Sequence, residues 1–223
     1  MSGRAFVAAG AVVLAALAGC GGQDRQPQPQ TGAAGKPATD AQVLMLARVL
    51  QSDFEHGGSQ FTAAFQIDGQ PALASGRVDF RSGRGNAVVR PANPDQGAER
   101  EFFWTRKKVL AQAAPGSRRY NPEAPDAQGN PVHAMVKFIN LLSAETIDNT
   151  ANITAAGPRL MGRTTIAGAP VEQFRYGNGI TLWIHTGSGL LRRIHTSRVN
   201  GGITVDLLTH EPVKIELPAE ARR

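Results

Sequence analysis

The sequence contains a single cysteine, Cys20, and few aromatic residues, which make up 6% of the 223-residue chain. With one thiol, the chain can form no internal disulfide and no metal site built from several cysteines. A second long apolar run is also missing after the one near the start, and a membrane-spanning helix needs about 20 apolar residues. The folded part is therefore expected to depend on its apolar core.

Motifs that place a nucleophile beside a base are absent too. The sequence has no Gly-x-Ser-x-Gly, no Ser-x-x-Lys and no His-Glu-x-x-His. The glycine run "RSGRG" at 81–85 lacks the Lys-Ser/Thr of a phosphate-binding loop, which favours a hairpin turn. We predict that the protein is not an enzyme, has no catalytic residues and uses no cofactor.

Three histidines late in the chain offer one alternative. His185, His195 and His210 could meet Asp206 on adjacent strands and bind a metal ion. Each histidine alternates with apolar residues, so we assign them to the solvent-facing side of a sheet. No metal site is predicted.

The first residues are typical of an export signal. Arg4 precedes a 15-residue apolar run, Ala5 to Gly19, which predicts a signal peptide over 1–19. The run ends in Leu-Ala-Gly-Cys, which resembles the bacterial lipobox, whose cysteine receives a diacylglycerol group. Cys20 is the predicted lipid anchor, and two or three acyl chains would give lasting membrane attachment. The alternative is an ordinary cleavage site beside a free cysteine.

The anchor implies a lipoprotein on the outer side of the bacterial cell membrane. Its formal net charge of +6 suits an anionic membrane surface as a partner, and export makes nucleic acid an unsuitable one. Residues 20–40 are rich in Gly, Pro and Gln, which predicts the lipidated cysteine and a flexible tether. An extended partner-binding segment is the alternative. Residues 41–223 are predicted to form one domain.

Helical spacing first appears at residues 40–58. Asp40 is the expected N-cap, and Gly57 and Gly58 are expected to end the helix. The predicted buried face consists of Val43, Leu46, Ala47, Leu50 and Phe54.

A period of two follows, which predicts strands at 59–68, 72–80, 87–90, 100–105 and 109–113. Phe61, Phe65, Val78 and Phe80 fall on one apolar face, and Gly76 is expected to mark a bulge.

The middle of the chain is predicted to be less regular. Residues 114–131 are expected to form a proline-rich loop, followed by a helix at 132–143 and a short helix at 144–153. The inward residues of the first of these helices are Met135, Phe138, Leu141 and Leu142. Further strands are predicted at 159–168, 171–177, 180–186, 190–199, 203–210 and 213–218. Grouped strands and helices indicate an α+β fold with one large antiparallel sheet, one face of which the helices cover.

The C-terminal run "TLWIHTGSGLLRRIHTSRVNGGITVDLLTHEPVKIELP" joins a strand, a Gly turn and a basic strand, and ends in a further strand. With the early "SGRVDF", it resembles the LolA/LolB lipoprotein-carrier superfamily, closest to its actinobacterial branch of LppX and LprG type. The resemblance covers roughly residues 41–218. The third hairpin departs from the family pattern, because "EFFWTRKKVLAQ" replaces its usual tyrosines.

The resemblance implies a curved, unclosed half-barrel with helices on its concave face and lipid acyl chains bound between sheet and helices. The residues it nominates to line such a cavity are Phe61, Phe65, Val78, Phe80, Phe102, Trp104, Phe138, Leu142 and Leu182. The alternative for each is ordinary core packing, since sequence does not reveal missing volume.

Two functions are compatible with these observations. The first is a membrane-anchored lipoprotein that binds or carries lipids, with acyl-chain or glycolipid cargo. The second is a non-catalytic interaction or stress-sensing module of the cell envelope, with a protein partner and no lipid cargo. The preference for Arg over Lys suits a high-GC actinobacterium.

Overall fold

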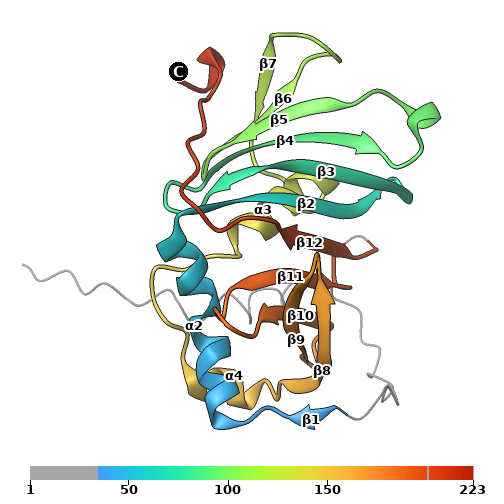
Figure 1. Ribbon diagram of the computed structural model, residues 1–223. Coiled ribbons are helices and arrows are strands. Elements are labelled where there is room, and N and C mark those ends of the chain that lie inside the picture. Colours follow the sequence, from blue (N-terminus) through green and yellow to red (C-terminus); the bar gives the residue numbers. More distant parts are fainter. Residues whose placement is uncertain (1–34, 200, 223) are drawn as a thin grey trace, which may run out of the picture.

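In the computed structural model, residues 35–199 and 201–222 are described, and they form one twelve-stranded antiparallel sheet with helices packed against it (Figure 1). The predicted signal peptide, Cys20 and most of the predicted tether lie outside the described residues. The strand order is β1-β8-β9-β10-β11-β12-β2-β3-β4-β5-β6-β7, so the edge strands β1 and β7 do not pair with each other. The predicted α+β fold with an unclosed curved sheet is confirmed.

The sheet consists of two runs of neighbouring strands that join where β12 pairs with β2, with Thr204 opposite Ala64. This junction brings together parts of the chain that are far apart in sequence. The first run contains β2 Gly58–Ile67, β3 Gln70–Asp79, β4 Arg84–Pro91, β5 Arg100–Trp104, β6 Val109–Gln112 and β7 Tyr120–Glu123. The second contains β8 Arg159–Ile166, β9 Ala169–Arg175, β10 Ile180–His185, β11 Leu191–Thr196 and β12 Ile203–Leu207, with β1 Lys36–Pro37 at its edge.

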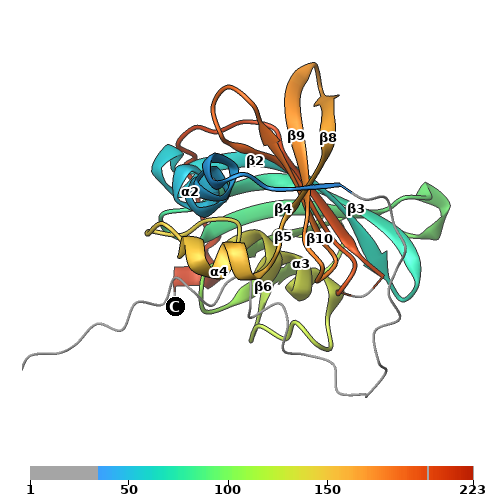
Figure 2. The same ribbon diagram turned by 90° about the horizontal axis from the view of Figure 1, so that it is seen from below.

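Three α-helices occur in the described part of the chain: α2 Asp40–His56, α3 Pro131–Asn140 and α4 Thr150–Ala155. Helix α3 packs against β2, whereas α2 and α4 pack on each other beside the second strand run (Figures 1 and 2). Two short 3-10 helices, η2 Pro94–Gln96 and η3 Ala219–Arg222, complete the described elements. Within the described ranges no helix is both long and apolar enough to span a membrane.

Alternation along β2 and β3 builds the floor of the core. Phe61, Phe65 and Val78 are buried, as is Phe80 just beyond β3, and outward neighbours such as Ala64 are exposed. The face predicted from the period of two is confirmed. Because a strand places alternate side chains on opposite faces, this pattern also fixes the register of the β2–β3 pair.

Gly76 does not mark a bulge, contrary to the prediction. It pairs with Phe61 on β2 and Ala87 on β4 without a shift in register. A Cβ atom at this position would lie 2.1 Å from the carbonyl oxygen of Asn86. Glycine is required here because the neighbouring strand comes too close for any side chain.

The predicted strand at 213–218 is wrong. Residues 208–218 instead run as an irregular segment past the end of β2, where the Leu208 and Glu211 N–H groups donate to the carbonyls of Gln60 and Gly58. Alternation still buries Ile215 at 7% exposure. Apart from these two hydrogen bonds to the first residues of β2, the segment pairs with no strand of the described sheet. We call residues 208–222 the C-terminal strap.

Two short edge strands occupy segments for which no strand was predicted. β7 lies within the predicted loop at 114–131, and its Pro122 is tolerated because an edge strand can lack one hydrogen-bond donor. β1 lies within the predicted tether at 20–40, where Lys36 and Pro37 pair with β8. The ordered domain therefore begins before residue 41.

The helices begin at residues other than those predicted. Thr39, not Asp40, is the N-cap of α2, and it forms a reciprocal capping box with Gln42. The short helix expected at 144–153 begins at Thr150, because the Asn149 side chain caps the Ala151 N–H at 2.8 Å. Gly57 ends α2 in a left-handed conformation, as predicted.

On α2, the predicted inward residues Val43, Leu46 and Ala47 are buried, whereas Leu50 and Phe54 are half-buried. On α3, Met135, Phe138 and the following Leu142 are buried as expected, and Leu141 is half-buried. The main core is thus a layer of sheet side chains beneath these helix faces.

Candidate functional site: a cleft at the end of helix α3

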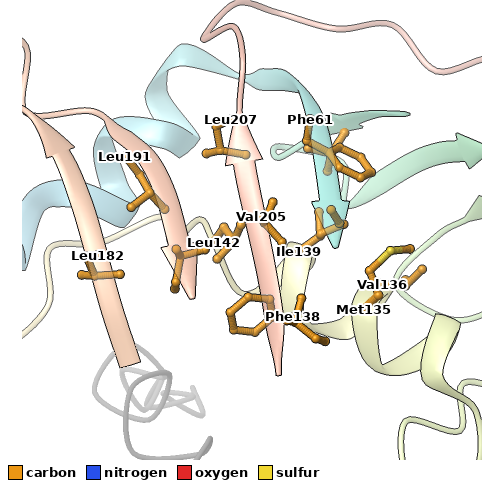
Figure 3. Packing of buried hydrophobic residues seen from close by; sticks show 14 of the residues in the cluster. Phe61, Met135, Val136, Phe138, Ile139, Leu142, Leu182, Leu191, Val205 and Leu207 are labelled. Atoms are coloured by element: carbon orange, nitrogen blue, oxygen red, sulfur yellow. The ribbon is translucent and has the colours of Figure 1, made fainter. Parts of the chain in front are cut away.

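The nine residues nominated to line a lipid cavity all belong to one continuous hydrophobic core. Each is at most 8% exposed. Figure 3 shows four of them: Phe138 and Leu142 of the α3 segment, with Phe61 and Leu182 on the facing strands. Trp104 packs against Phe61 at a ring-centroid distance of 6.2 Å. The full set is Phe61, Phe65, Val78, Phe80, Phe102, Trp104, Phe138, Leu142 and Leu182.

A cleft of about 920 Å³ lies beside this core, at the C-terminal half of α3. Its walls come from α3, the β5–β6 turn, the 125–128 loop, the 141–146 segment, and the ends of α2 and β3. Of the nine nominated residues, only Phe80 lines it. The lining residues are Phe54, Phe80, Gly83, Thr105, Arg106, Val109, Pro125, Asp126, Ala127, Gln128, His133, Val136, Lys137, Asn140, Leu141, Ser143, Ala144, Glu145 and Thr146.

The wall of the cleft is mainly apolar, with contributions from Phe54, Phe80, Val109, Val136 and Leu141. Small-molecule sites in proteins have volumes of about 300–1,000 Å³ and are lined mostly by apolar side chains. The size and lining of this cleft fall within that class.

Both signs of charge occur among the lining residues. Arg106 and Lys137 are cationic, and Asp126 and Glu145 are anionic. Arg106 also donates to the carbonyl oxygen of Arg81 at 3.1 Å, which fixes the guanidinium at one side. Since these formal charges balance, the apolar wall, not net charge, defines the class of ligand that the cleft can hold.

His133 anchors the loop that forms one wall. Its Nδ1 atom accepts the Asp126 N–H at 3.0 Å, so the ring proton must reside on Nε2. Nε2 lies 3.1 Å from Glu123 Oε2, at ion-pair distance but not aligned as a hydrogen bond. The side chain is 2% exposed. His133 thus joins α3, β7 and the 125–128 loop at one buried point.

The same loop is closed by the Asp126 carboxylate, which accepts the backbone N–H groups of Gly129 and Gln128 at 2.9 and 3.1 Å. These hydrogen bonds, that of Gly129 first, lower the pKa of Asp126 below its ordinary value. Next along the chain, the Asn130 side chain caps α3. The cleft wall is therefore held by local polar contacts.

Trp104 and Asn140 separate the cleft from the core. Trp104 is fully buried, and its Nε1–H donates to Asn140 Oδ1 at 3.2 Å, while Asn140 lines the cleft. The indole lies directly over Gly85, where a Cβ atom would come within 2.0 Å of the ring. Glycine at 85 is what allows this large side chain to pack between strand and helix.

A buried polar pair is formed by His210 and Asp53, the residue that precedes Phe54 of the cleft wall. Asp53 is completely buried, and its Oδ1 lies 3.4 Å from Nε2 of His210 in the C-terminal strap. That Nε2 also lies 2.8 Å from the Leu191 carbonyl oxygen, and neither Asp53 oxygen has a well-aligned hydrogen-bond partner among the described residues. Burial raises the pKa of Asp53 to about 6, and the nearby His210 partly opposes that rise.

The three late histidines do not converge. His185 Nδ1 lies 2.9 Å from the Ser188 hydroxyl, and His195 Nδ1 lies 3.0 Å from that of Thr204. Asp206 binds Arg193 through both carboxylate oxygens. His210 is 5% exposed, which corrects its assignment to the solvent-facing side of the sheet. Its burial follows from the strap, which leaves the sheet after β12.

Comparisons with known proteins give little further information. No family model matches the chain, and no curated protein matches it. An uncharacterized conserved protein from Thermus thermophilus is 12% identical, with 83% of this chain and 94% of that chain covered and a TM-score of 0.43. A DUF1329 family protein from Desulfovibrio piger is 9% identical, with 79% of this chain and 94% of that chain covered and a TM-score of 0.32. With scores below 0.5, neither likeness bears on what this chain does.

Proposed function

We propose that this protein is an exported, lipid-anchored lipoprotein of the cell membrane that binds the acyl part of a lipid in the α3 cleft. The observation that carries the proposal is the 920 Å³ cleft with an apolar wall at the margin of an unclosed sheet. The lipobox-like "LAGC" supports the anchor, with Cys20 as the acylated residue. The resemblance to the LolA/LolB superfamily supports the same class of ligand by analogy.

The site we propose differs from the one that the resemblance implied. The residues nominated for a cavity between sheet and helices belong to one buried core, and of them only Phe80 lines the cleft. We place the ligand instead against Phe54, Val136 and Leu141, with its polar head toward the solvent-exposed Lys137. Binding there leaves the core intact.

A second function is favoured by the burial of all nine nominated residues in one hydrophobic core. A non-catalytic envelope module that recognises a protein partner needs no internal cavity. In that case the cleft would hold a partner side chain instead of a lipid. We rank this function second because the wall of the cleft is mainly apolar and its volume suits a small ligand.

Native mass spectrometry of the full chain, extracted from its membranes in a mild detergent, tests the first function. We expect an intact mass that includes acyl groups on Cys20 and a further lipid that dissociates on activation. Titration with the fluorescent fatty acid cis-parinaric acid should be saturable. A lipid-free mass together with no saturable uptake would contradict lipid binding, and a cross-linked envelope protein would then support the second function.

A further inference from the structure

Two arginines face each other on adjacent strands at the β1 edge of the sheet. Arg159 on β8 is directly opposite Arg175 on β9, and both side chains are exposed. The next pair along, Leu160 and Phe174, faces the core, so the arginines lie on the outer face. Like charges directly opposite one another destabilise a strand pair, which makes this arrangement unfavourable unless an anion lies between them.

Two acids of the second strand run are already engaged in ion pairs. Glu172 binds Arg163 at 2.8 Å and also accepts from Gln42. Asp206 is held by Arg193. Among residues 35–199 and 201–222, neither arginine of the pair has a carboxylate within ion-pair distance. The strand pairing extends the row from Arg175 to Thr181 and then His195, which adds no negative charge.

The arginine pair also lies where the chain leads toward Cys20. Pro37 of β1 is directly opposite Arg159, and the described chain begins two residues earlier, at Gly35. Gly35 follows Cys20 by 15 positions, and such a segment spans at most about 50 Å. A bilayer that holds Cys20 is therefore within reach of this face.

We propose that the outer face of β8 and β9 is the membrane-facing surface of the domain, and that Arg159 and Arg175 bind phosphates of anionic lipid headgroups. The inference rests on the proposed anchoring through Cys20. Guanidinium groups bind phosphate through two parallel hydrogen bonds, so an adjacent pair suits neighbouring headgroups. Each basic residue close to an anionic bilayer favours contact by about fivefold, a modest effect that the covalent anchor makes sufficient.

The test uses the full chain, extracted with its anchor and reconstituted into vesicles of phosphatidylglycerol and phosphatidylcholine. A fluorophore is attached in one sample at Thr164→Cys on β8 and in another at Ser75→Cys on β3, both of which are exposed positions. The vesicles contain a lipid with a nitroxide headgroup as quencher. We expect quenching at 164 to be at least about twofold stronger than at 75. The difference should vanish in pure phosphatidylcholine, or in 1 M salt, where the Debye length is about 3 Å.

The matched variants change the same amount of charge at two places. Arg159→Glu with Arg175→Glu should abolish the preference for position 164. Arg77→Glu with Arg90→Glu, at exposed positions on β3 and β4, should leave that preference in place. Equal loss in both pairs would mean that bulk charge acts, and would overturn the inference.

Flotation and intact mass separate this inference from the proposed function. A chain that carries acyl groups and floats with the vesicles, but is quenched equally at both positions, overturns the orientation alone. A chain that carries no acyl groups and floats with neither kind of vesicle overturns the anchor and the orientation together.

Discussion

The two faces of α3 show how differently a core and a binding cleft arise from one helix. Met135, Phe138 and Ile139 face the sheet and are at most 2% exposed. Lys137 and Asn140, between and beside them in sequence, line the cleft. The core is produced by periodic apolar residues that interdigitate with the strands. The cleft is formed around the C-terminal half of the helix by the β5–β6 turn, the 125–128 loop and the 141–146 segment, which leave an open space beside it.

The largest expected effect would test whether the core is packed or is a closed ligand cavity. Phe138→Ala should lower the free energy of unfolding by about 4 kcal/mol in lipid-free protein, because it deletes a buried ring from a filled core. Urea denaturation measures it. Leu44→Ala, at a position 45% exposed on α2, is the matched control and should cost less than about 1 kcal/mol. A loss at Phe138 no larger than the control would indicate that the ring lines empty space.

The next effect concerns Asp53, whose carboxylate is completely buried. With its pKa raised from 3.8 to about 6, Asp53 binds a proton more tightly in the folded state than in the unfolded state. Its contribution to stability is therefore present below pH 4 and is lost as the pH rises through 6. Two pKa units correspond to about 3 kcal/mol.

Asp53→Asn removes this titration, so the stability of the variant relative to wild type should rise by about 3 kcal/mol between pH 4 and pH 7. Urea titrations at several pH values measure the trend. Asp95→Asn, at an exposed carboxylate of η2, provides the control. A pH-independent difference for Asp53→Asn would contradict the raised pKa of Asp53.

A smaller effect is expected at the boundary between core and cleft. Gly85→Ala should destabilise the fold by about 2 kcal/mol, because the new methyl group meets the Trp104 ring at 2.0 Å. Gly177→Ala, which has nothing within 4 Å of its added methyl group, should be nearly neutral. Thermal unfolding of both variants checks this. If the two variants have the same stability, the Trp104 ring can shift to make room for the methyl group, and its packing against Gly85 is not rigid.

The smallest effect concerns binding. Ala144→Trp should fill the cleft and weaken cis-parinaric acid binding by about tenfold, or about 1.4 kcal/mol, with little change in stability. Fluorescence titration measures it. Ala64→Trp, on the exposed side of β2, adds the same indole elsewhere and should leave binding unchanged. Undiminished binding in Ala144→Trp would locate the lipid outside the cleft.

Periodic features of the sequence predicted most of the fold. The faces of β2 and β3 and the inward residues of α3 followed from spacing, because burial selects apolar residues at every second position, or at every third and fourth. The strand at 213–218 was predicted wrongly for the same reason, since its alternation is real but the segment pairs with no strand of the described sheet. Local pattern cannot report whether a partner strand lies beside a segment.

The cleft could not be predicted in this way. Arg106, Asp126 and Thr146 have no shared period, and only the tertiary fold brings them together. Asp53 did carry a signal: it is seven residues after Leu46, on the same helical stripe, where an acid is unexpected. Strands β2 to β12 all lie between Asp53 and its neighbour His210 in the sequence, so no local pattern connects the two residues.

The pairing of β12 with β2 has a consequence for how the chain acquires its structure. Ala64 of β2 pairs with Thr204 of β12, which follows it by 140 residues. The central strand β2 therefore cannot complete its pairing until β12, the last of the described strands, has been made. Until then β2 presents an unpaired edge, which is a template for association with other chains. We expect slow folding, since contacts between distant residues form late. A chain exported from its N-terminus would have to keep that edge of β2 covered until β12 has also been exported.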